Sequence, residues 1–215
     1  SKSTKNHIEK INQDRYGQWK KYEEENKKKR GESVETDRWK KKYTPPVGIT
    51  VDDLPELPDS WTWVTLDTLT AYDVDYRGKT PPYSDSGIPV ISSGNVQNGK
   101  IKMDDPKYVS EETYEEWLTR GVPEPGDLLI TTEAPPGDTA LFPDDKKYLT
   151  TRRIITFKTV GVNNRYLQLC FNYSVVEKYI HRNSRGTTVD RILKDVLFET
   201  PIPLPPLSEQ KEIVN

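Results

Sequence analysis

Residues 125–131 read Pro-Gly-Asp-Leu-Leu-Ile-Thr, a turn followed by a short apolar run. The Pro-Gly-Asp triplet is typical of a turn, and Leu128–Thr131 predicts a buried strand. Residues 151–158 are rich in isoleucine and predict a second strand of this type. Val90-Ile91 and the alternating residues Trp61–Val64 predict two more. The body of the chain is therefore expected to contain several short strands.

Helices are predicted between these strands, without regular alternation. Ser110 can cap a helix with an acidic first turn, and residues 165–181 repeat apolar side chains at spacings of three and four. Gly186 separates this helix from a short one near residues 190–195, and Ser208 caps a last one. The irregular order disfavours a doubly wound parallel sheet. The sequence predicts an α+β fold with a mixed, strongly twisted sheet of short strands and a few helices.

The N-terminal region is predicted to be a basic extension of this domain. Residues 5–30 predict a polar helix whose thin apolar stripe is interrupted by Arg15, so that the helix needs an outside partner or stays frayed. Residues 31–60 contain several prolines and little that could pack, as a linker does. We expect three parts: a helical extension and Pro-containing linker at 1–56, a folded domain at 57–207 and the start of a truncated helix at 208–215.

Composition excludes several classes of protein. The mean hydropathy is −0.85, and no apolar run approaches the roughly 18 residues of a membrane span. The 5 Trp and 12 Tyr argue against a disordered chain, and a single cysteine excludes an internal disulfide framework. The sequence has no signal peptide or lipidation motif, so a cytoplasmic location without a membrane partner is expected. Because it begins at Ser1 and its only methionine is Met103, we expect a piece of a longer protein.

No catalytic site is predicted. Thr80-Pro-Pro-Tyr83 resembles the motif with which amino-methyltransferases hold a target amino group, but no glycine-rich turn follows a strand to bind the methyl donor. Asp59 with Asp105 and Lys107 matches a scattered nuclease triad, which chance explains better among 34 acidic residues. We expect neither a metal nor a cofactor.

Histidine and cysteine, which often act as base and nucleophile, are each interpreted here as structural residues. His181 ends a predicted helix, where a cation is stabilised by the helix dipole. Cys170 lies on the apolar face of the same helix and is interpreted as part of the core. An enzyme is therefore not supported from within this chain.

Binding residues are predicted where basic and hydroxyl side chains gather. Arginine forks match phosphate oxygens and guanine edges, and hydroxyl groups and glycine amides suit phosphate. The candidate phosphate contacts are Arg152, Arg153, Arg185, Thr187, Thr188 and Lys194. A second polar loop, at 92–98, carries amides that can pair with adenine edges. The candidate base-reading residues are Lys79, Asn95, Gln97 and Arg191.

Charge is distributed unevenly along the chain. The net charge of −2 is the sum of +6 over residues 1–50, −14 over 51–145 and +6 over 146–215. Binding to a polyanion depends on the local potential within a Debye length of about 8–10 Å, so the small average does not exclude it. We expect a polyanion to meet only the face made by residues 146–194 and the polar loops, with the acidic face turned away or toward the basic surface of a partner.

Several short motifs occur in a specific order. Residues 57–66 read Leu-Pro-Asp-Ser-Trp-Thr-Trp-Val-Thr-Leu. The later motifs are Tyr76-Arg-Gly-Lys-Thr-Pro81, Gly87-Ile-Pro-Val90, Gly94-Asn-Val96, Gly126-Asp-Leu-Leu129, Gly186-Thr-Thr188 and Pro201-Ile-Pro-Leu-Pro-Pro-Leu-Ser-Glu-Gln210. In this order they resemble a target recognition domain from the specificity subunit of type I restriction–modification systems.

The resemblance implies a DNA-binding protein without catalytic residues. In that family each recognition domain reads half of a split site in double-stranded DNA. Methyltransferase (modification) subunits methylate adenine with S-adenosylmethionine, and a restriction/translocase subunit joins through the assembled complex. The basic stretch Arg38–Tyr43 resembles what precedes the second recognition domain, and residues 208–215 resemble the start of the conserved spacer helix. The C-terminal recognition domain is therefore implied.

Three alternatives stay open from the sequence. A carbohydrate-binding module would use exposed Trp and Tyr beside Asp and Asn, and its binding would not depend on salt. A protein-docking adaptor without DNA binding would use Pro201–Leu207 and the terminal helix. A methyltransferase would need this chain alone to bind the cofactor.

Overall fold

The computed structural model describes residues 2–76, 80–151 and 153–215, and its centre is a four-stranded antiparallel sheet. The strand order is β2-β10-β7-β8, with β2 at Thr70–Val74, β7 at Leu128–Thr131, β8 at Thr139–Leu141 and β10 at Ile154–Thr159. All four residues of β7 are buried, as are all but the last of β10. These two strands confirm the predicted buried strands.

The remaining strands form three smaller sheets. Strand β3 (Ile88–Ile91) pairs with β6 (Lys107–Val109) antiparallel and with β9 (Leu149–Thr150) parallel. The other pairs are β4 (Val96–Gln97) with β5 (Lys100–Ile101) and β1 (Thr62–Thr65) with β11 (Pro201–Leu204). The α+β class is confirmed, but the strands are divided among four small sheets because most have only two to four residues.

The proline-rich segment at 201–207 becomes a strand in its first half. Pro203 faces Trp63 in the antiparallel register of β1 and β11. Proline lacks an N–H to donate, and a two-stranded sheet tolerates it because each strand is an edge. The carbonyl of Pro203 accepts a hydrogen bond from the buried Tyr166 hydroxyl at 2.6 Å, which ties this strand to the core.

The helices partly follow the predictions. Helix α2 (Glu111–Trp117) is capped by Ser110, whose hydroxyl accepts from the Thr113 amide at 3.1 Å. The helix predicted at 165–181 is two helices, α3 (Asn164–Cys170) and α4 (Ser174–Asn183). Their break leaves Leu169 and Tyr173 exposed by 47% and 40%, so the expectation that both lie on an apolar face was wrong.

Two C-terminal helices begin at other residues than expected. Helix α5 spans Lys194–Phe198, later than the predicted 190–195. Helix α6 spans Leu207–Ile213, and its cap position is occupied by Pro206 rather than by Ser208. Proline fits this place because the first helical amides need no partner within the helix. Gln210 of α6 is fully buried and its side chain bonds the Asn163 amide and the Pro205 carbonyl, which docks the helix on the domain.

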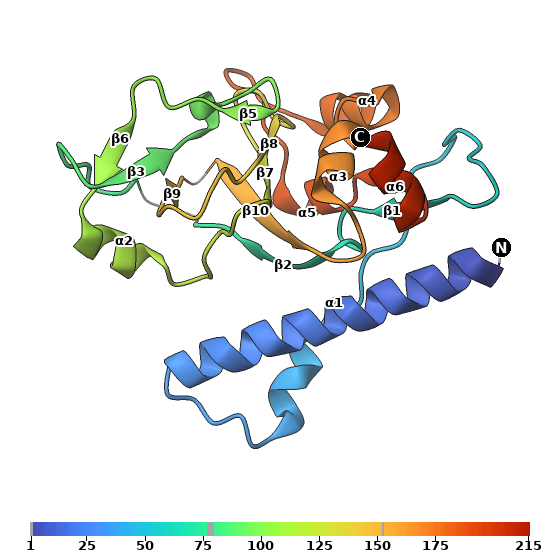
Figure 1. Cartoon of the computed structure of the whole chain (residues 1–215), viewed down its shortest axis with the longest axis horizontal. Coiled ribbons are helices and arrows are strands. Elements are labelled where there is room, and N and C mark those ends of the chain that lie inside the picture. Colours follow the sequence, from blue (N-terminus) through green and yellow to red (C-terminus); the bar gives the residue numbers. More distant parts are fainter. Residues whose placement is uncertain (1, 77–79, 152) are drawn as a thin grey trace.

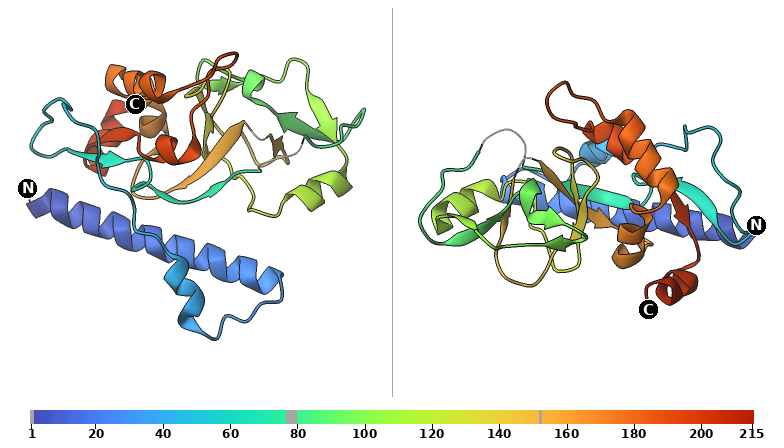
Figure 2. Two further views of the ribbon diagram at one scale, coloured as in Figure 1. Left: turned by 180° about the vertical axis from the view of Figure 1, so that it is seen from behind. Right: turned by 90° about the horizontal axis from the view of Figure 1, so that it is seen from above.

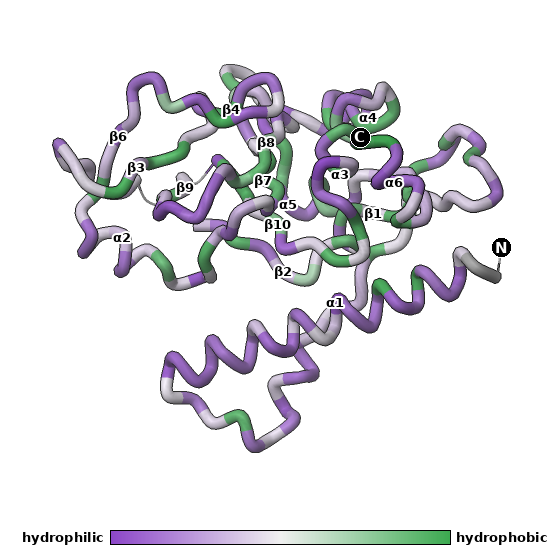
Figure 3. The backbone as a smooth tube through the Cα atoms, viewed as in Figure 1, coloured by the Kyte–Doolittle hydropathy of each residue, from purple (hydrophilic) through white to green (hydrophobic). Residues whose placement is uncertain are grey.

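The N-terminal helix α1 (Lys2–Lys29) lies along β2 on one side of the central sheet (Figures 1 and 2). Figure 3 shows hydrophilic residues along most of α1. Ile11 is buried, and the ring of Tyr22 stacks on that of Tyr72 with 3.9 Å between centroids. The outside partner that the polar helix was predicted to need is therefore the domain itself.

Arg15 anchors this helix. Its Nε donates to the carbonyls of Asp67 (3.0 Å) and Thr70 (2.8 Å), and its Nη2 meets Asp67 Oδ1 at 2.7 Å. Arg15 was expected to interrupt the apolar stripe of the helix. It is instead a buried residue whose hydrogen bonds join the helix to the domain.

The expected linker also packs more than predicted. It contains a 3-10 helix, η1 (Asp37–Lys42), whose Trp39 is buried beside Trp19 at 6.1 Å between ring centroids. Tyr43 lies against Trp19 at 5.0 Å. The statement that this segment contains little that could pack was wrong, because its aromatic residues meet those of α1.

Candidate nucleic-acid interface

Three polar segments gather on the side of the molecule opposite to α1. They are the segment 92–99 around β4, the β7–β8 loop at 132–138 and the α4–α5 loop at 184–192, which is the orange-red loop near the top of Figure 1. The view from behind in Figure 2 also places this loop across the sheet from α1. We call the surface formed by these three segments the loop face.

Backbone hydrogen bonds close the α4–α5 loop. Arg185 and Arg191 form an antiparallel bridge, with N–H to carbonyl distances of 2.8 and 3.2 Å. A Cβ on Gly186 would overlap the backbone carbonyl of Val189, so the turn requires glycine. The Ile192 amide donates to the Thr132 carbonyl at 2.9 Å and fixes the loop to the β7–β8 loop. Four residues that were predicted to bind, Arg185, Thr187, Thr188 and Arg191, are thus carried by a fixed backbone.

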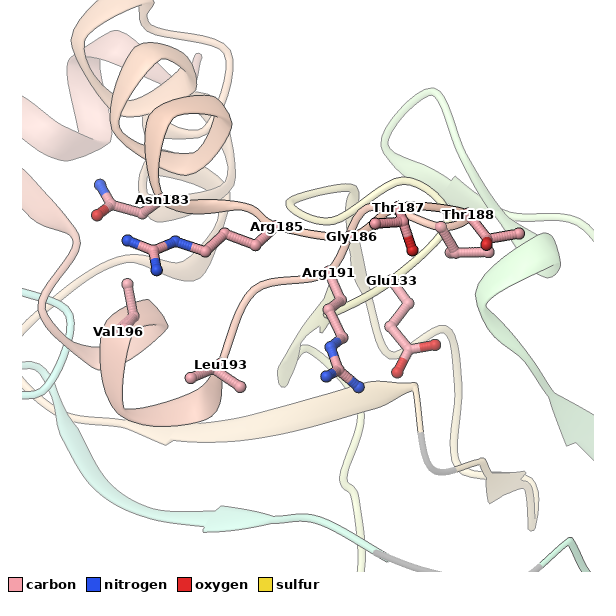
Figure 4. A pocket seen from close by; sticks show the side chains of 10 residues that line it. Glu133, Asn183, Arg185, Gly186, Thr187, Thr188, Arg191, Leu193 and Val196 are labelled. Atoms are coloured by element: carbon pink, nitrogen blue, oxygen red, sulfur yellow. The ribbon is translucent and has the colours of Figure 1, made fainter.

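Four of these predicted residues line one cleft of about 670 Å³, which we call the arginine cleft. Figure 4 shows Arg185 reaching toward Asn183 and Val196, while Thr187 and Thr188 lie farther along the loop. Arg191 extends beside Glu133. Within the described residues, no ion pair or side-chain hydrogen bond engages the guanidinium group of Arg185 or Arg191. Both groups therefore retain their donors for a ligand.

Glu133 joins the arginine cleft to Arg153. Its backbone forms an antiparallel bridge with Arg191, and its Oε2 lies 3.0 Å from Nε of Arg153. Arg153 also lines a neighbouring cleft of about 480 Å³ with Tyr83 and Ser92. Sequence reasoning missed Glu133; the only available signal was its position just after a buried strand, where loops often carry functional residues.

The second predicted loop uses its amide groups internally. Oδ1 of Asn95 accepts from the amide and the hydroxyl of Ser92 at 2.9 and 2.7 Å, and its Nδ2 donates to the Lys102 carbonyl at 2.8 Å. These bonds shape the loop and leave Asn95 little capacity to read a base. Gln97 is exposed, although its Nε2 donates to Gly94, and it lines a further cleft beside Gln168.

One predicted residue is placed away from this face. Lys194 lies on the side of α1, where its ammonium pairs with Asp73 at 2.5 Å and with Asp75 at 3.5 Å. It is only three residues from Arg191, but it is the first residue of α5, and its side chain faces Asp73 and Asp75 instead of the arginine cleft. Lys79 and Arg152 lie outside the described residues.

The other chemical motifs keep structural or surface positions. Tyr83 of the Thr-Pro-Pro-Tyr motif is exposed, with the Lys107 ammonium 4.8 Å from its ring centroid. Burial raises the pKa of the Cys170 thiol to about 12, so this cysteine stays protonated in the core. In the part of the chain that the structure describes, no three acidic, histidine or cysteine side chains are arranged to hold a metal, and no helix is long and apolar enough to cross a membrane.

Four of the 20 acidic residues of the middle region lie together on α2. This helix has four glutamates and lies at the end of the molecule away from α4 and α5 (Figure 1). Lys147 forms ion pairs with Glu111 and Glu115 of this helix. The loop face therefore lies outside the region where these four glutamates are concentrated.

Comparisons with known proteins agree on one family. A family model described as the type I restriction modification DNA specificity domain matches residues 58–215. A protein of Haemophilus influenzae described as a type I restriction enzyme specificity subunit is 29% identical over 130 residues, which are 58% of this chain and 32% of that protein. The EcoAI specificity subunit of Escherichia coli is 25% identical over 187 residues, 81% of this chain and 31% of its own length. The chain thus spans about a third of these curated relatives.

Solved structures show the same fold. A chain from a study of complex assembly and conformational transition of the type I R-M system matches 97% of this chain and 46% of its own length, with a TM-score of 0.54 and 20% identity. The HsdS subunit from Thermoanaerobacter tengcongensis matches 74% of this chain and 37% of its own, with a TM-score of 0.52 and 23% identity. At these identities the likeness concerns the fold alone.

Proposed function

This chain belongs to the family of type I restriction modification DNA specificity domains, and from that premise we propose that its loop face binds double-stranded DNA and reads part of a recognition sequence. The observation that carries the proposal is the pair of unengaged guanidinium groups, Arg185 and Arg191, in a cleft that also holds two threonine hydroxyls. Such donors suit phosphate oxygens and the major-groove edge of guanine. We assign phosphate contacts to Arg153, Arg185, Thr187 and Thr188, and base contacts to Gln97 and Arg191.

The position of these residues supports the division of roles. Arg185 lies at one end of the cleft, and the backbone around it is closed by the Arg185–Arg191 bridge. A rigid loop lowers the conformational entropy lost on binding, because the donors are already held in place. Lys194 is left out of this interface, since it is paired with two aspartates on the other side.

The salt dependence of binding tests the proposal. Arg185→Ala is expected to lower the affinity for all duplex sequences and to reduce the slope of log affinity against log salt by about one unit, because one phosphate contact is lost. Lys194→Ala is the matched control and should leave the slope unchanged. If the unsubstituted chain shows no salt-dependent binding to duplex DNA and instead binds a carbohydrate with an affinity that does not depend on salt, the DNA proposal is excluded and the carbohydrate-binding alternative is favoured.

The same proposal assigns catalysis to other chains. In it, this domain reads half of a bipartite site and directs methyltransferase and restriction/translocase subunits, which supply the chemistry, to DNA in the cytoplasm. The names of the relatives support such an assembly, although this chain spans only part of their length. Mapping adenine methylation in the source cell, with and without the parent gene, tests it: a bipartite methylated motif should disappear with the gene.

A further inference from the structure

We infer that Glu133 and Arg191 form a reader for one G·C base pair, in which Arg191 donates to guanine and Glu133 accepts from the amino group of cytosine. This inference rests on the proposed DNA-binding function and names the chemistry that its cleft selects. In the major groove guanine offers two acceptors, O6 and N7, while cytosine offers the N4 amino donor. A guanidinium fork beside a carboxylate matches both halves of such a pair.

The unusual feature of the cleft is its carboxylate. Arg185, Thr187, Thr188 and Arg191 can all donate to a polyanion, whereas Glu133 in the same cleft repels phosphate. A carboxylate at a DNA-binding surface is favourable where it meets a hydrogen-bond donor of a base. Glu133 is therefore placed to contact a base edge and not the backbone.

The backbone places the Glu133 carboxylate, the acceptor, beside the Arg191 guanidinium, the donor. The backbones of Glu133 and Arg191 are joined by an antiparallel bridge, and Figure 4 shows their side chains extending side by side. Arg153 holds Oε2 of Glu133 at 3.0 Å. No hydrogen bond within the described residues engages Oε1, which leaves one oxygen for an amino group. The side chain of Glu133 is 29% exposed, so it is oriented by its surroundings but can still be reached from the cleft.

The carboxylate selects cytosine over adenine, the other base with an amino donor in the major groove. Adenine presents its N6 amino group next to the N7 acceptor, a pattern that an amide matches with two hydrogen bonds. A carboxylate cannot donate to N7 and would place its negative charge beside that nitrogen. Cytosine lacks this acceptor, so Glu133 favours it.

A binding selection tests the inference. The 215-residue chain is incubated with a library of randomised duplex DNA, and the bound sequences are compared with those of Glu133→Ala and Glu133→Gln. The parent chain should enrich cytosine at one position, with guanine on the opposite strand. Glu133→Ala should reduce that enrichment by roughly 5- to 150-fold, the value of one good base contact, while other positions keep theirs. Glu133→Gln should move the preference at that position toward adenine.

Two controls distinguish a base contact by Glu133 from a general effect of its negative charge. Glu116→Gln removes one negative charge from α2 and should leave every preference unchanged. Arg153→Ala should weaken binding to all sequences and lessen the cytosine preference, because Arg153 holds Oε2 of Glu133. If Arg153→Ala abolishes the preference and Glu133→Gln does not move it toward adenine, Glu133 only positions Arg153 and the inference is overturned.

The remaining outcomes are also decisive. Unchanged preferences in both Glu133 variants, or an equal weakening at all positions, overturn the inference and leave DNA binding intact. If the unsubstituted chain binds duplex DNA in a salt-dependent way but enriches no sequence, the inference is likewise overturned and DNA binding is left intact. A parent chain that binds no duplex DNA overturns the proposed function itself.

Discussion

Replacing Arg15 with alanine should release the N-terminal helix from the domain. The side chain makes five polar contacts. Three reach the domain: two to main-chain carbonyls through Nε and one to the Asp67 carboxylate through Nη2. The other two join Nη1 to the linker, at the Tyr43 hydroxyl (2.8 Å) and the Thr44 carbonyl (2.9 Å). The pair is shielded from water, with side-chain exposures of 8% for Arg15 and 13% for Asp67.

The magnitude follows from what the substitution leaves behind. Among the described residues, Asp67 would keep only the Val47 amide as a partner for its charge. Removing one member of a buried ion pair typically costs about 3–5 kcal/mol, because the other charge stays buried without compensation. This cost falls on the contact between α1 and the domain, so we expect α1 to detach locally more often while the central sheet stays folded.

Hydrogen exchange is the assay for this prediction. Amides of α1 should lose protection in Arg15→Ala, while those of β7 and β10 keep theirs. Lys21→Ala, on an exposed face of the same helix, is the control for loss of a positive charge. The DNA affinity should be unchanged, because the loop face lies on the opposite side of the molecule. Unaltered protection of α1 in Arg15→Ala would refute the reasoning that this residue anchors the helix.

Two further predictions concern the loop face and the core. Gly186→Ala should lower DNA affinity several-fold with little change in thermal stability, because its Cβ overlaps the Val189 carbonyl and must reshape an exposed loop; unchanged titration of duplex DNA would contradict this. Cys170 should resist alkylation at pH 8 in the native chain and react on unfolding, because burial raises its pKa to about 12. Its folded-state pKa is raised, so its contribution to stability is complete below about pH 8.5 and is lost as the pH rises toward 12, which denaturation across that range would detect.

The sequence was most informative where a short local pattern determines the structure. Leu128–Thr131 became a strand as predicted, and Ser110 caps α2 as expected, because both depend on a few adjacent residues. The periodicity over 165–181 was misleading, since a repeat of three and four can continue across two successive helices. The break after Cys170 depends on how α4 packs on the core, which no local pattern records.

Long-range contacts explain the other differences. Arg15 was read as a break in an apolar stripe, and its partner Asp67 is 52 residues away in the chain. Glu133 was missed for the same reason, since only the fold places it beside Arg191. Conversely, Lys194 is close to Arg191 in the sequence but lies on the other side of the domain. Distance along the chain therefore grouped four residues of the α4–α5 loop that do line one cleft, but it could not tell which nearby cations share that surface.

Pairing, rather than the number of basic residues, explains how a chain with a net charge of −2 can present a surface to DNA. Lys194 and Lys158 each lie between two carboxylates, so their charges are already compensated within the protein. Such lysines release few counterions from DNA, because they bring little uncompensated charge to the phosphates. Arg185 and Arg191 differ in having no such partner among the described residues, and they lie away from the glutamates of α2. The loop face holds Arg185 and Arg191 together with three carboxylates, Glu133, Asp138 and Asp190. Its positive potential is therefore confined to the two unengaged guanidinium groups, and in the proposed reader Glu133 adds selectivity beside one of them.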